Sequence, residues 1–293
     1  VESCDTYYYT LARDMGVDLM HDQMKPLGFG QITGIDILGE SRGVLPSTEW
    51  KRNTYKKPEQ QRWYSGETIS LGIGQGYNSF TMLQIAHAMG TVANNGLKMK
   101  PHLVREVVDV ETKASTLVAK EPVGQLPLTP ENLEVIKKGM VGVNIEGTSA
   151  TSFIGAQYVS AGKTGTAQVF TVKQNEKYNA SSIDERMRDH ALFVAFAPTD
   201  DPKVALAMVV ENAGFGAQNA APIARRVFDF VLLGQYPAEE DIEAVQKGQA
   251  TRPIGKPRAV ANVPWPPKSV EPVLDEAAEA RATAKAEKKA KQP

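Results

Sequence analysis

The sequence predicts an α+β fold, in which helices pack on an antiparallel sheet. Three strand-like segments are crowded late in the chain, at 158–170, 190–197 and 203–210, and a short polar turn joins the last two. Helical patterns precede and follow this group, one beginning at Thr129 and one spanning 219–233. A run of strands with helices on either side of it is typical of the α+β class.

The composition is that of a globular protein. The chain has 293 residues, of which 42% are hydrophobic and 23% charged, and this length suits one large core or two modest ones. A net charge of −1 provides no basic excess, which argues against a nucleic-acid partner. No apolar run reaches the length of a membrane span, and no signal peptide is present. Because the first residue is Val1 rather than methionine, we expect the chain to be part of a longer protein.

The N-terminal part of the chain predicts two helices separated by loops. Residues 5–15 form an amphipathic pattern with Asp5 as its N-cap. The segment 27–43 is punctuated by glycine and predicts loop and turn, whereas 50–64 is polar and suits an exposed excursion. Over 79–94 the apolar residues recur on one helical face and an Asn-Gly pair follows, which predicts the second helix.

The middle of the chain predicts a strand pair and then a helix. Segments 103–110 and 115–118 have strand character on either side of a turn. Thr129 and Pro130 are a threonine cap and a proline at the first helical position, so a helix begins there. Three apolar side chains of this helix are expected on its buried side: Leu133, Ile136 and Met140.

The last predicted element of the core is the helix over 219–233. Its apolar residues recur at helical spacing: Ile223, Val227, Phe230 and Val231. After Tyr236 prolines recur, and the chain ends in a mixture of alanine and charged residues with too little apolar surface for a core. We therefore expect a domain over 1–236 and a proline-rich, mostly disordered tail over 237–293.

One predicted strand contains a motif that can carry chemistry, Lys-Thr-Gly. Gly162 and Gly165 interrupt the strand, and glycine inside a strand marks a bulge or a close approach of another backbone. Lys163, Thr164 and Thr166 then offer a cation and two hydroxyls at that point. Taken alone, the motif leaves two interpretations open, a functional site and a glycine bulge with a solvated lysine.

A second motif, Ser3-Cys4-Asp5, stands directly before the first helix. A Ser-x-Asn/Asp element followed by Lys-Thr-Gly, with an upstream Ser-x-x-Lys, defines the penicillin-binding proteins and serine β-lactamases. The sequence resembles the transpeptidase domain of a class B penicillin-binding protein, of the elongation-type penicillin-binding protein 2 group of Gram-negative bacteria, over roughly 1–236. Three segments carry the resemblance: SCDTYYY at 3–9, WYSGETISLGIGQG at 63–76 and SAGKTGTAQ at 160–168.

The resemblance implies the transpeptidase fold of this family and a peptidoglycan D,D-transpeptidase that cross-links the cell wall during elongation through a serine acyl-enzyme and is inhibited by β-lactams. Such acyl transfer needs a nucleophile, a proton shuttle, an oxyanion hole and a grip on the terminal carboxylate of a stem peptide. Lys163 supplies positive charge, and the hydroxyls of Thr164 and Thr166 suit a carboxylate. Gly165 leaves room for the substrate backbone to pair with the strand edge. By resemblance, the N–H of Thr166 forms half of the oxyanion hole.

Ser3 and Asp5 also receive roles from the resemblance. Ser3 relays a proton between the catalytic lysine and the leaving amine, since a hydroxyl both donates and accepts. Asp5 stands where many relatives have asparagine, and an ionised carboxylate only accepts, so that its expected partner is a cation such as the upstream catalytic lysine. A plain helix cap is the alternative role for Asp5.

The nucleophile motif Ser-x-x-Lys occurs only at Ser160–Lys163. That lysine already belongs to Lys-Thr-Gly, and the pair falls on a strand, whereas in the family the serine opens a helix and the lysine follows one turn later on the same face. We therefore treat Ser160 as a coincidence and expect the nucleophile to precede Val1. The chain alone is then expected to be inactive.

The proposed chemistry needs no cofactor. Cys4 is the single cysteine, which excludes an internal disulfide, and a small buried residue is its plainest interpretation. The resemblance implies a structural zinc close to Cys4, with the other ligands upstream of this chain. The four histidines are scattered without ligand spacing. The glycines of 72–76 lack the ending of a phosphate loop and are expected to form a turn near the floor of the active site.

The resemblance also implies partners and a location. The partners are peptidoglycan stem peptides, β-lactam antibiotics, a SEDS-family glycosyltransferase and the elongation machinery. The location is the periplasmic face of the bacterial inner membrane, with anchoring by an N-terminal helix absent from this chain. Two other functions stay open: a non-catalytic β-lactam-sensing or scaffold domain, and a D,D-carboxypeptidase or β-lactamase on the same fold.

Overall fold

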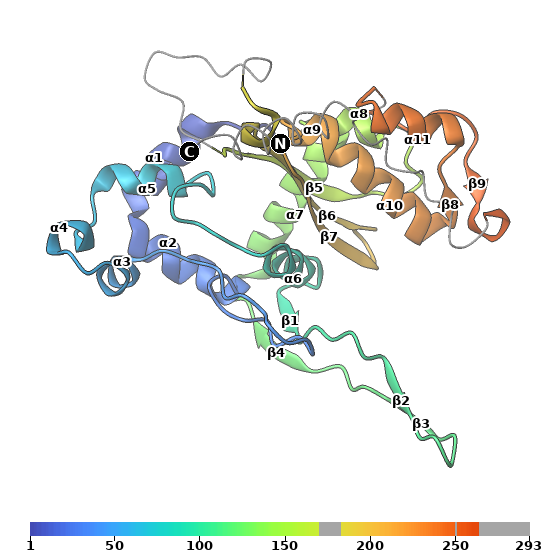
Figure 1. The fold of residues 1–293 in the computed structure, drawn as a ribbon, viewed down its shortest axis with the longest axis horizontal. Helices are drawn as coiled ribbons and strands as arrows, with labels where there is room; N and C mark the ends of the chain where they lie inside the picture. Colours follow the sequence, from blue (N-terminus) through green and yellow to red (C-terminus); the bar gives the residue numbers. More distant parts are fainter. Residues whose placement is uncertain (170–182, 250, 264–293) are drawn as a thin grey trace, which may run out of the picture.

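The computed structural model describes residues 1–169, 183–249 and 251–263. Its centre is an antiparallel sheet in the order β5-β6-β7, formed by β5 (Ala161–Ala167), β6 (His190–Ala197) and β7 (Val204–Val210). Helices cover both faces of this sheet, which confirms the predicted α+β class (Figure 1). Strand β6 has the predicted bounds. Strands β5 and β7 are shorter than predicted, and residue 170 of the first predicted strand lies outside the described residues.

The two faces of β6 divide the core, because successive side chains of a strand point to opposite sides. Phe193 packs with Phe153 and Phe228, under α8 (Ala150–Phe153) and α10 (Ala221–Leu233). Phe196 packs on the other side with Val92 and Leu133, under α6 (Met82–Ala93) and α7 (Pro130–Ile145). Both central phenylalanines are fully buried.

Helices α6 and α7 begin at threonine caps. Thr129 accepts the backbone N–H of Asn132 at 3.3 Å, as its sequence context predicts. Thr81 accepts the N–H of Gln84 at 3.1 Å, and the Gln84 side chain returns to the N–H of Thr81, forming a capping box. Helix α6 therefore begins later than the predicted segment 79–94.

Helix α10 buries a different side from the one its apolar pattern indicates. Val227, Phe230 and Val231 are exposed, whereas Ala224 and Phe228 are fully buried. Alanines on α10 meet alanines on β6 in this cluster, and small side chains allow the helix to lie close to the sheet. The helical spacing of Val227, Phe230 and Val231 predicted the helix, but these side chains do not form its buried face.

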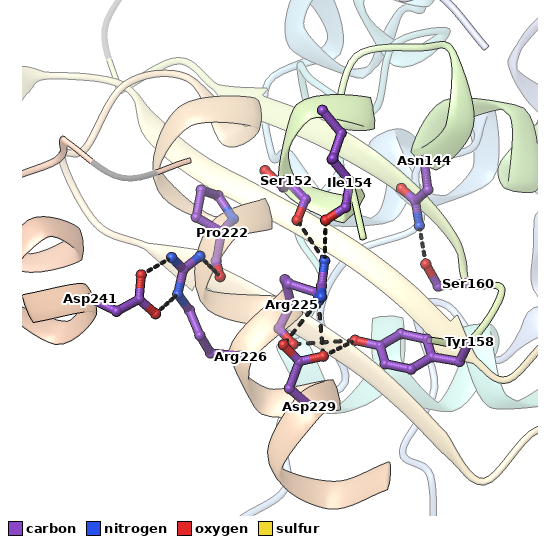
Figure 2. Close-up of polar contacts among 10 residues, drawn as sticks. All are labelled: Asn144, Ser152, Ile154, Tyr158, Ser160, Pro222, Arg225, Arg226, Asp229 and Asp241. Atoms are coloured by element: carbon purple, nitrogen blue, oxygen red, sulfur yellow. Dashed lines mark hydrogen bonds and ion pairs between the residues drawn. The ribbon is translucent and has the colours of Figure 1, made fainter. Parts of the chain in front are cut away.

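Two arginines on the buried side of α10 are paired within the protein (Figure 2). Arg225 binds Asp229 at 2.9 Å and donates to the carbonyls of Ser152 and Ile154 at the end of α8. Tyr158 donates to the same Asp229 carboxylate at 2.8 Å. These bonds supply the partners that a buried guanidinium needs.

The N-terminal part of the chain forms a helical layer beside the sheet (Figure 1). Its helices are α1 (Asp5–Met15), α2 (Val17–Met24), η1 (Lys25–Leu27), α3 (Thr48–Thr54), α4 (Pro58–Gln61) and α5 (Ser65–Leu71). The bounds of α1 confirm the predicted helix, but the cap position is Cys4 and no side chain caps it. Asp5 is instead the first helical residue, where a carboxylate complements the helix dipole.

The predicted exposed excursion over 50–64 is wrong in part. The segment contains α4 and most of α3, and Lys51 within it is only 3% exposed. A buried lysine needs a partner, and Lys51 has one in Glu67 of α5. The polar composition of the segment did not reveal this pairing.

A long two-stranded arm projects from the body below α6 (Figure 1). Its root is β1 (Leu97–Met99) paired with β4 (Pro122–Gln125), and its tip is β2 (Glu106–Val108) paired with β3 (Ser115–Leu117). The pairing of β2 with β3 confirms the predicted strand pair in a shorter form. Asp36, from the glycine-punctuated loop, accepts the N–H groups of Leu103 and Val104 at 2.7 and 2.9 Å and so holds the arm near its root.

The chain continues in ordered structure after α10. The elements are β8 (Gln235–Tyr236), α11 (Glu239–Gln246), β9 (Arg258–Ala259) and η4 (Val260–Asn262), and a short η3 (Glu185–Met187) precedes β6. Asp241 is 1% exposed and accepts two hydrogen bonds from Arg226 (Figure 2). The predicted disordered tail is therefore wrong for 237–249 and 251–263. No helix in the described part is long and apolar enough to cross a membrane.

Candidate active site

Lys163 brings the two sequence motifs together. Its ammonium, on β5, donates to Ser3 Oγ at 2.5 Å and to the carbonyl oxygen of Thr164 at 2.8 Å. Ser3 lies directly before α1, so that a contact between distant parts of the chain joins the Ser-x-Asp and Lys-Thr-Gly elements. A lysine and a serine in hydrogen bond can exchange a proton with a reacting group.

The charge of Lys163 is tuned by its surroundings. Burial lowers the pKa of its ammonium below the usual value, and the negative charges of Asp5 and Glu2 oppose this shift in part. Asp5 therefore acts on Lys163 through its charge. A lysine with a lowered pKa gives up a proton more readily, as a proton relay requires.

The two glycines of the motif have separate packing reasons. A Cβ at Gly162 would lie 2.7 Å from the Phe193 ring, so this glycine makes room for the core. A Cβ at Gly165 would lie 3.2 Å from the Cβ of Leu192. The backbone of Gly216, at the start of α9 (Gly216–Asn219), also lies close, since a Cβ on Gly216 would be 2.4 Å from the Gly165 carbonyl oxygen. The pairing of β5 with β6 has no register shift. Of the two predicted reasons for glycine, close backbone approach is therefore correct, and a bulge is not present.

A groove of about 900 Å³ borders these residues. Ser3, Asp5, Lys163, Thr164, Gly165 and Thr166 all line it. Strand β5 is at the edge of the described sheet, where an extended peptide can pair with it. Cys4 lines the groove as well, with an exposed thiol rather than the buried one expected.

An apolar part of the groove lining comes from α6 and α7. It is formed by Met89, Val135, Ile136, Met140 and Val143. Ile136 is 39% exposed, so its predicted place on the buried side of the helix is wrong, whereas Leu133 is buried. Helical spacing identifies an apolar face but does not distinguish a face toward the core from a face toward a groove.

Thr148 is a site residue that the sequence did not indicate. Its hydroxyl lies 2.8 Å from the hydroxyl of Thr164, and it lines the groove. It stands in the turn between α7 and α8, and no catalytic motif includes it. Only the folding of this turn against β5 brings the two threonines together.

The glycine-containing loop 72–76 lies between the two motif-bearing elements. A Cβ on Gly72 would lie 2.5 Å from the carbonyl oxygen of Tyr8 in α1. Gln75 donates through Nε2 to the carbonyl of Thr166 at 3.4 Å, and both Gly72 and Gln75 line the groove. The loop therefore lies beside the site, where a turn was predicted.

Comparison with known proteins identifies the family. A protein-family model described as "Penicillin binding protein transpeptidase domain" matches residues 1–229 of the chain. The chain belongs to the penicillin-binding protein transpeptidase family. The resemblance seen in the sequence motifs is thereby confirmed.

Among curated relatives, this transpeptidase chain is 43% identical over 248 residues to peptidoglycan D,D-transpeptidase MrdA of Haemophilus influenzae, covering 82% of this chain and 36% of the relative. Pseudomonas aeruginosa PBP2 in complex with WCK 5153 superposes with a TM-score of 0.63 at 38% identity, covering 78% of this chain and 45% of that one. Helicobacter pylori PBP2 in complex with MreC superposes at 0.62 with 27% identity, covering 78% and 38%. The chain thus spans about a third of the length of the curated relative.

Ser160, the one Ser-x-x-Lys serine of this transpeptidase chain, is buried away from the groove. It is 4% exposed, and its hydroxyl accepts a hydrogen bond from Asn144 Nδ2 at 2.8 Å (Figure 2). Ser149 Oγ donates in turn to the side-chain oxygen Oδ1 of Asn144 at 2.6 Å. This buried network joins the end of α7 to the residue before β5.

The described residues do not fit a metal site at Cys4. No group of three or more His, Cys, Asp or Glu side chains suitable for a metal occurs within the ranges that the structure describes. A zinc site needs three or four such ligands. The zinc expectation therefore has no support from the residues around this thiol.

Proposed function

We propose that the protein containing this chain is a peptidoglycan D,D-transpeptidase of the cell-elongation type, acting through a serine acyl-enzyme and inhibited by β-lactams. The observation that carries the proposal is the 2.5 Å contact between Lys163 and Ser3 at the edge of a large groove. The family match and the curated D,D-transpeptidase relative support it.

The residues of the groove receive the following roles. Lys163 supplies positive charge toward the substrate carboxylate and shares a proton with Ser3, which passes it to the leaving amine. The hydroxyls of Thr164 and Thr166 bind the terminal carboxylate of the stem peptide. The N–H of Thr166 contributes to the oxyanion hole, and the peptide lies along the β5 edge beside Gly165.

Asp5 takes an electrostatic role in this scheme. As a carboxylate it accepts hydrogen bonds and stabilises cations, and its charge already acts on Lys163. A second cation, the lysine of an upstream Ser-x-x-Lys motif, is the further partner that we propose.

We also propose that the nucleophilic serine lies upstream of Val1. The sequence contains no Ser-x-x-Lys at a helix start, and Ser160 is buried in a hydrogen-bond network outside the groove. The apolar lining from α6 and α7 supports the proposal, because exposed Val135 and Ile136 offer packing for such a helix.

Fluorescent penicillin on a denaturing gel tests the proposal. This chain and the same chain joined to its upstream segment are compared. We expect covalent label on the joined protein only, and Ser160→Ala in the joined protein should leave the label unchanged. Label on the chain alone would place the nucleophile within it, and label on neither would favour a scaffold or sensor.

Product analysis with a stem-peptide donor and an amine acceptor separates transfer from hydrolysis. A cross-linked dimer is the expected product. Free D-alanine without dimer would indicate a carboxypeptidase, and rapid release of hydrolysed β-lactam would indicate a β-lactamase.

Partners and location follow from the same assignment. We propose stem peptides and β-lactams as ligands, with a SEDS-family glycosyltransferase and the elongation machinery as protein partners. The MreC complex of the Helicobacter pylori relative supports an assembly of this kind. We propose the periplasmic face of the inner membrane as the site of action.

A further inference from the structure

The helical layer contains an ion pair between a buried lysine and a partly buried glutamate, for which the proposed reaction has no direct use. Lys51 of α3 is 3% exposed, and its ammonium donates to both carboxylate oxygens of Glu67 in α5, at 2.6 Å to Oε2. The rings of Trp63, Tyr64 and Tyr77 surround the ammonium, with centroids 5.4, 5.4 and 5.5 Å from Nζ. Both the counter-ion and the ring faces therefore hold this cation.

Glu67 also ties together the two ends of the segment 64–77. Its Oε2 accepts the backbone N–H of Tyr64 at 2.9 Å, and its Oε1 accepts the hydroxyl of Tyr77 at 2.9 Å. Burial raises the pKa of Glu67, but the bonds from Lys51, Tyr64 and Tyr77 outweigh burial and hold that pKa below its usual value. Burial, and then the bond to Glu67, raises the pKa of Tyr77 to about 12.

The loop 72–76 lies between these two ends and contacts both motif-bearing elements. Gly72 packs directly on the backbone of α1 at Tyr8, and α1 follows Ser3. Gln75 reaches the carbonyl of Thr166 on β5. A shift of the loop therefore changes the spacing between the helix after Ser3 and the strand of Lys163.

We propose that Glu67 is a positioning residue of the active site. With Lys51 and Tyr77 it fixes the loop 72–76 in the gap between α1 and β5, and the loop sets the separation of the Ser-x-Asp and Lys-Thr-Gly motifs. The inference rests on the proposed function, because its effect is on the rate of acylation. A displacement of about 1 Å at a reacting group can lower a rate by about a hundredfold.

The test uses the full-length protein and three variants. Glu67→Gln removes the counter-ion of Lys51, and Tyr77→Phe removes one hydroxyl but keeps the ring. Asp241→Asn is the matched control, since it disrupts another buried ion pair far from the loop in sequence. Acylation rates with fluorescent penicillin are measured well below the unfolding temperature, and hydrogen exchange is followed in the peptides 3–9 and 160–168.

We expect Glu67→Gln to slow acylation by about tenfold to a hundredfold. Tyr77→Phe should slow it by a smaller factor, and both should speed exchange in 3–9 and 160–168. Asp241→Asn should lose thermal stability while acylating at the wild-type rate. If Glu67→Gln does not fold, Tyr77→Phe decides, and a fourth variant, Lys51→Arg, which keeps a cation beside Glu67, should acylate at close to the wild-type rate.

Two results would overturn the inference while leaving the proposed function intact. One is a wild-type acylation rate in both Glu67→Gln and Tyr77→Phe. The other is a loss of acylation rate in Asp241→Asn as large as that in Glu67→Gln, which would show a global effect of stability. If the wild-type protein takes no label, the proposed function fails instead. Exchange then decides: faster exchange at both motifs supports positioning by Glu67, and a change confined to 64–77 contradicts it.

Discussion

At the scale of single residues, Thr148 determines how the Thr164 hydroxyl can face a ligand. A hydroxyl carries one hydrogen and can accept two bonds. Thr164 Oγ1 lies 2.8 Å from Thr148 Oγ1 and 3.4 Å from the Lys163 ammonium. When Thr148 donates, Thr164 accepts both bonds and keeps its own hydrogen for a carboxylate in the groove.

We expect Thr148→Val to slow acylation of the full-length protein by a β-lactam about threefold to tenfold, the effect of one lost hydrogen bond. Thr148→Ser keeps the hydroxyl and should acylate at close to the wild-type rate. Stopped-flow or gel-based acylation rates provide the measurement. An unchanged rate in the valine variant would show that Thr164 is oriented without Thr148.

Sequence reasoning found the residues that belong to motifs and missed those placed by tertiary packing. Ser3 and Lys163 were selected from short patterns, and the structure places them in contact. Thr148 has no pattern of its own, because its position depends on how a turn packs against β5. Gln75 lies in the segment 63–76 that carries the resemblance, but its bond to Thr166 depends on how the loop packs. Their contribution becomes visible only in three dimensions.

At the scale of elements, the arm depends on what holds its root. Every residue of β2 and β3 is exposed, and an isolated hairpin is only marginally stable. Asp36 joins the arm to the glycine-punctuated loop through the N–H groups of Leu103 and Val104. The same two bonds, that of Val104 first, lower the pKa of Asp36 below its usual 3.8.

We expect Asp36→Asn to speed hydrogen exchange at Leu103 and Val104, since one amide oxygen replaces two carboxylate oxygens. Asp109→Asn is the matched control, because Asp109 accepts similar backbone bonds at the hairpin tip. It should leave the two root amides protected. Equal exchange at the root in the wild type and in Asp36→Asn would contradict the assignment.

The lowered pKa gives the root a defined response to acid. A carboxyl whose pKa is lowered in the folded state contributes stability above the unfolded value of 3.8 and loses it as the pH falls through the lowered value. We expect the root to resist limited proteolysis at pH near 5 and to become sensitive only in stronger acid. The Asp36→Asn arm should lack this pH dependence.

A third prediction at this scale concerns the ion pair between Arg226 of α10 and Asp241 of α11. Asp241→Asn leaves the buried Arg226 without its counter-ion, so we expect the free energy of unfolding to fall by about 3–5 kcal/mol. Glu239→Ala removes an exposed partner of Arg258 and should cost less than about 1 kcal/mol. Equilibrium urea unfolding measures both, and equal losses of unfolding free energy in the two variants would contradict a special contribution of the buried Arg226–Asp241 pair.

These elements also show where sequence reasoning fails for the fold. The strand-like segment 190–197, which is apolar from Ala191 to Ala197, predicted β6 with the correct bounds. The region after Tyr236 was assigned as tail because its composition lacks apolar surface. A single buried carboxylate, Asp241, organises part of that region by pairing with Arg226, and composition cannot show such a pairing.

At the scale of the whole molecule, ordered structure extends past the family domain. The family match ends at 229, whereas β8, α11, β9 and η4 continue to Asn262. The extension contacts α10 through Arg226, and the backbone N–H of Ile254 donates to Asp241 at 3.0 Å. The extension is therefore packed on the family domain.

Truncation tests this. We compare two proteins that keep the upstream segment, one ending after residue 263 and the other ending after residue 236. The shorter protein leaves Arg226 with its hydrogen bond to the Pro222 carbonyl but without its carboxylate counter-ion, and we expect the unfolding midpoint to fall by about 6 °C or more. Differential scanning calorimetry measures the shift. Equal midpoints would show that the extension adds no stability.

The close approach of Gly216 to β5 has a consequence for how the groove tolerates substitution. A Cβ at 216 would lie 2.2 Å from the carbonyl oxygen of Leu192 and 2.4 Å from that of Gly165, so any side chain there must force the start of α9 and the strands β5 and β6 apart. Its neighbour Phe215 is 61% exposed and lines the same groove. Under the proposed function, we therefore expect substitutions at 215 to change the rate of β-lactam acylation while β5 stays in place, whereas a substitution at 216 would also disturb the groove proposed for the stem peptide.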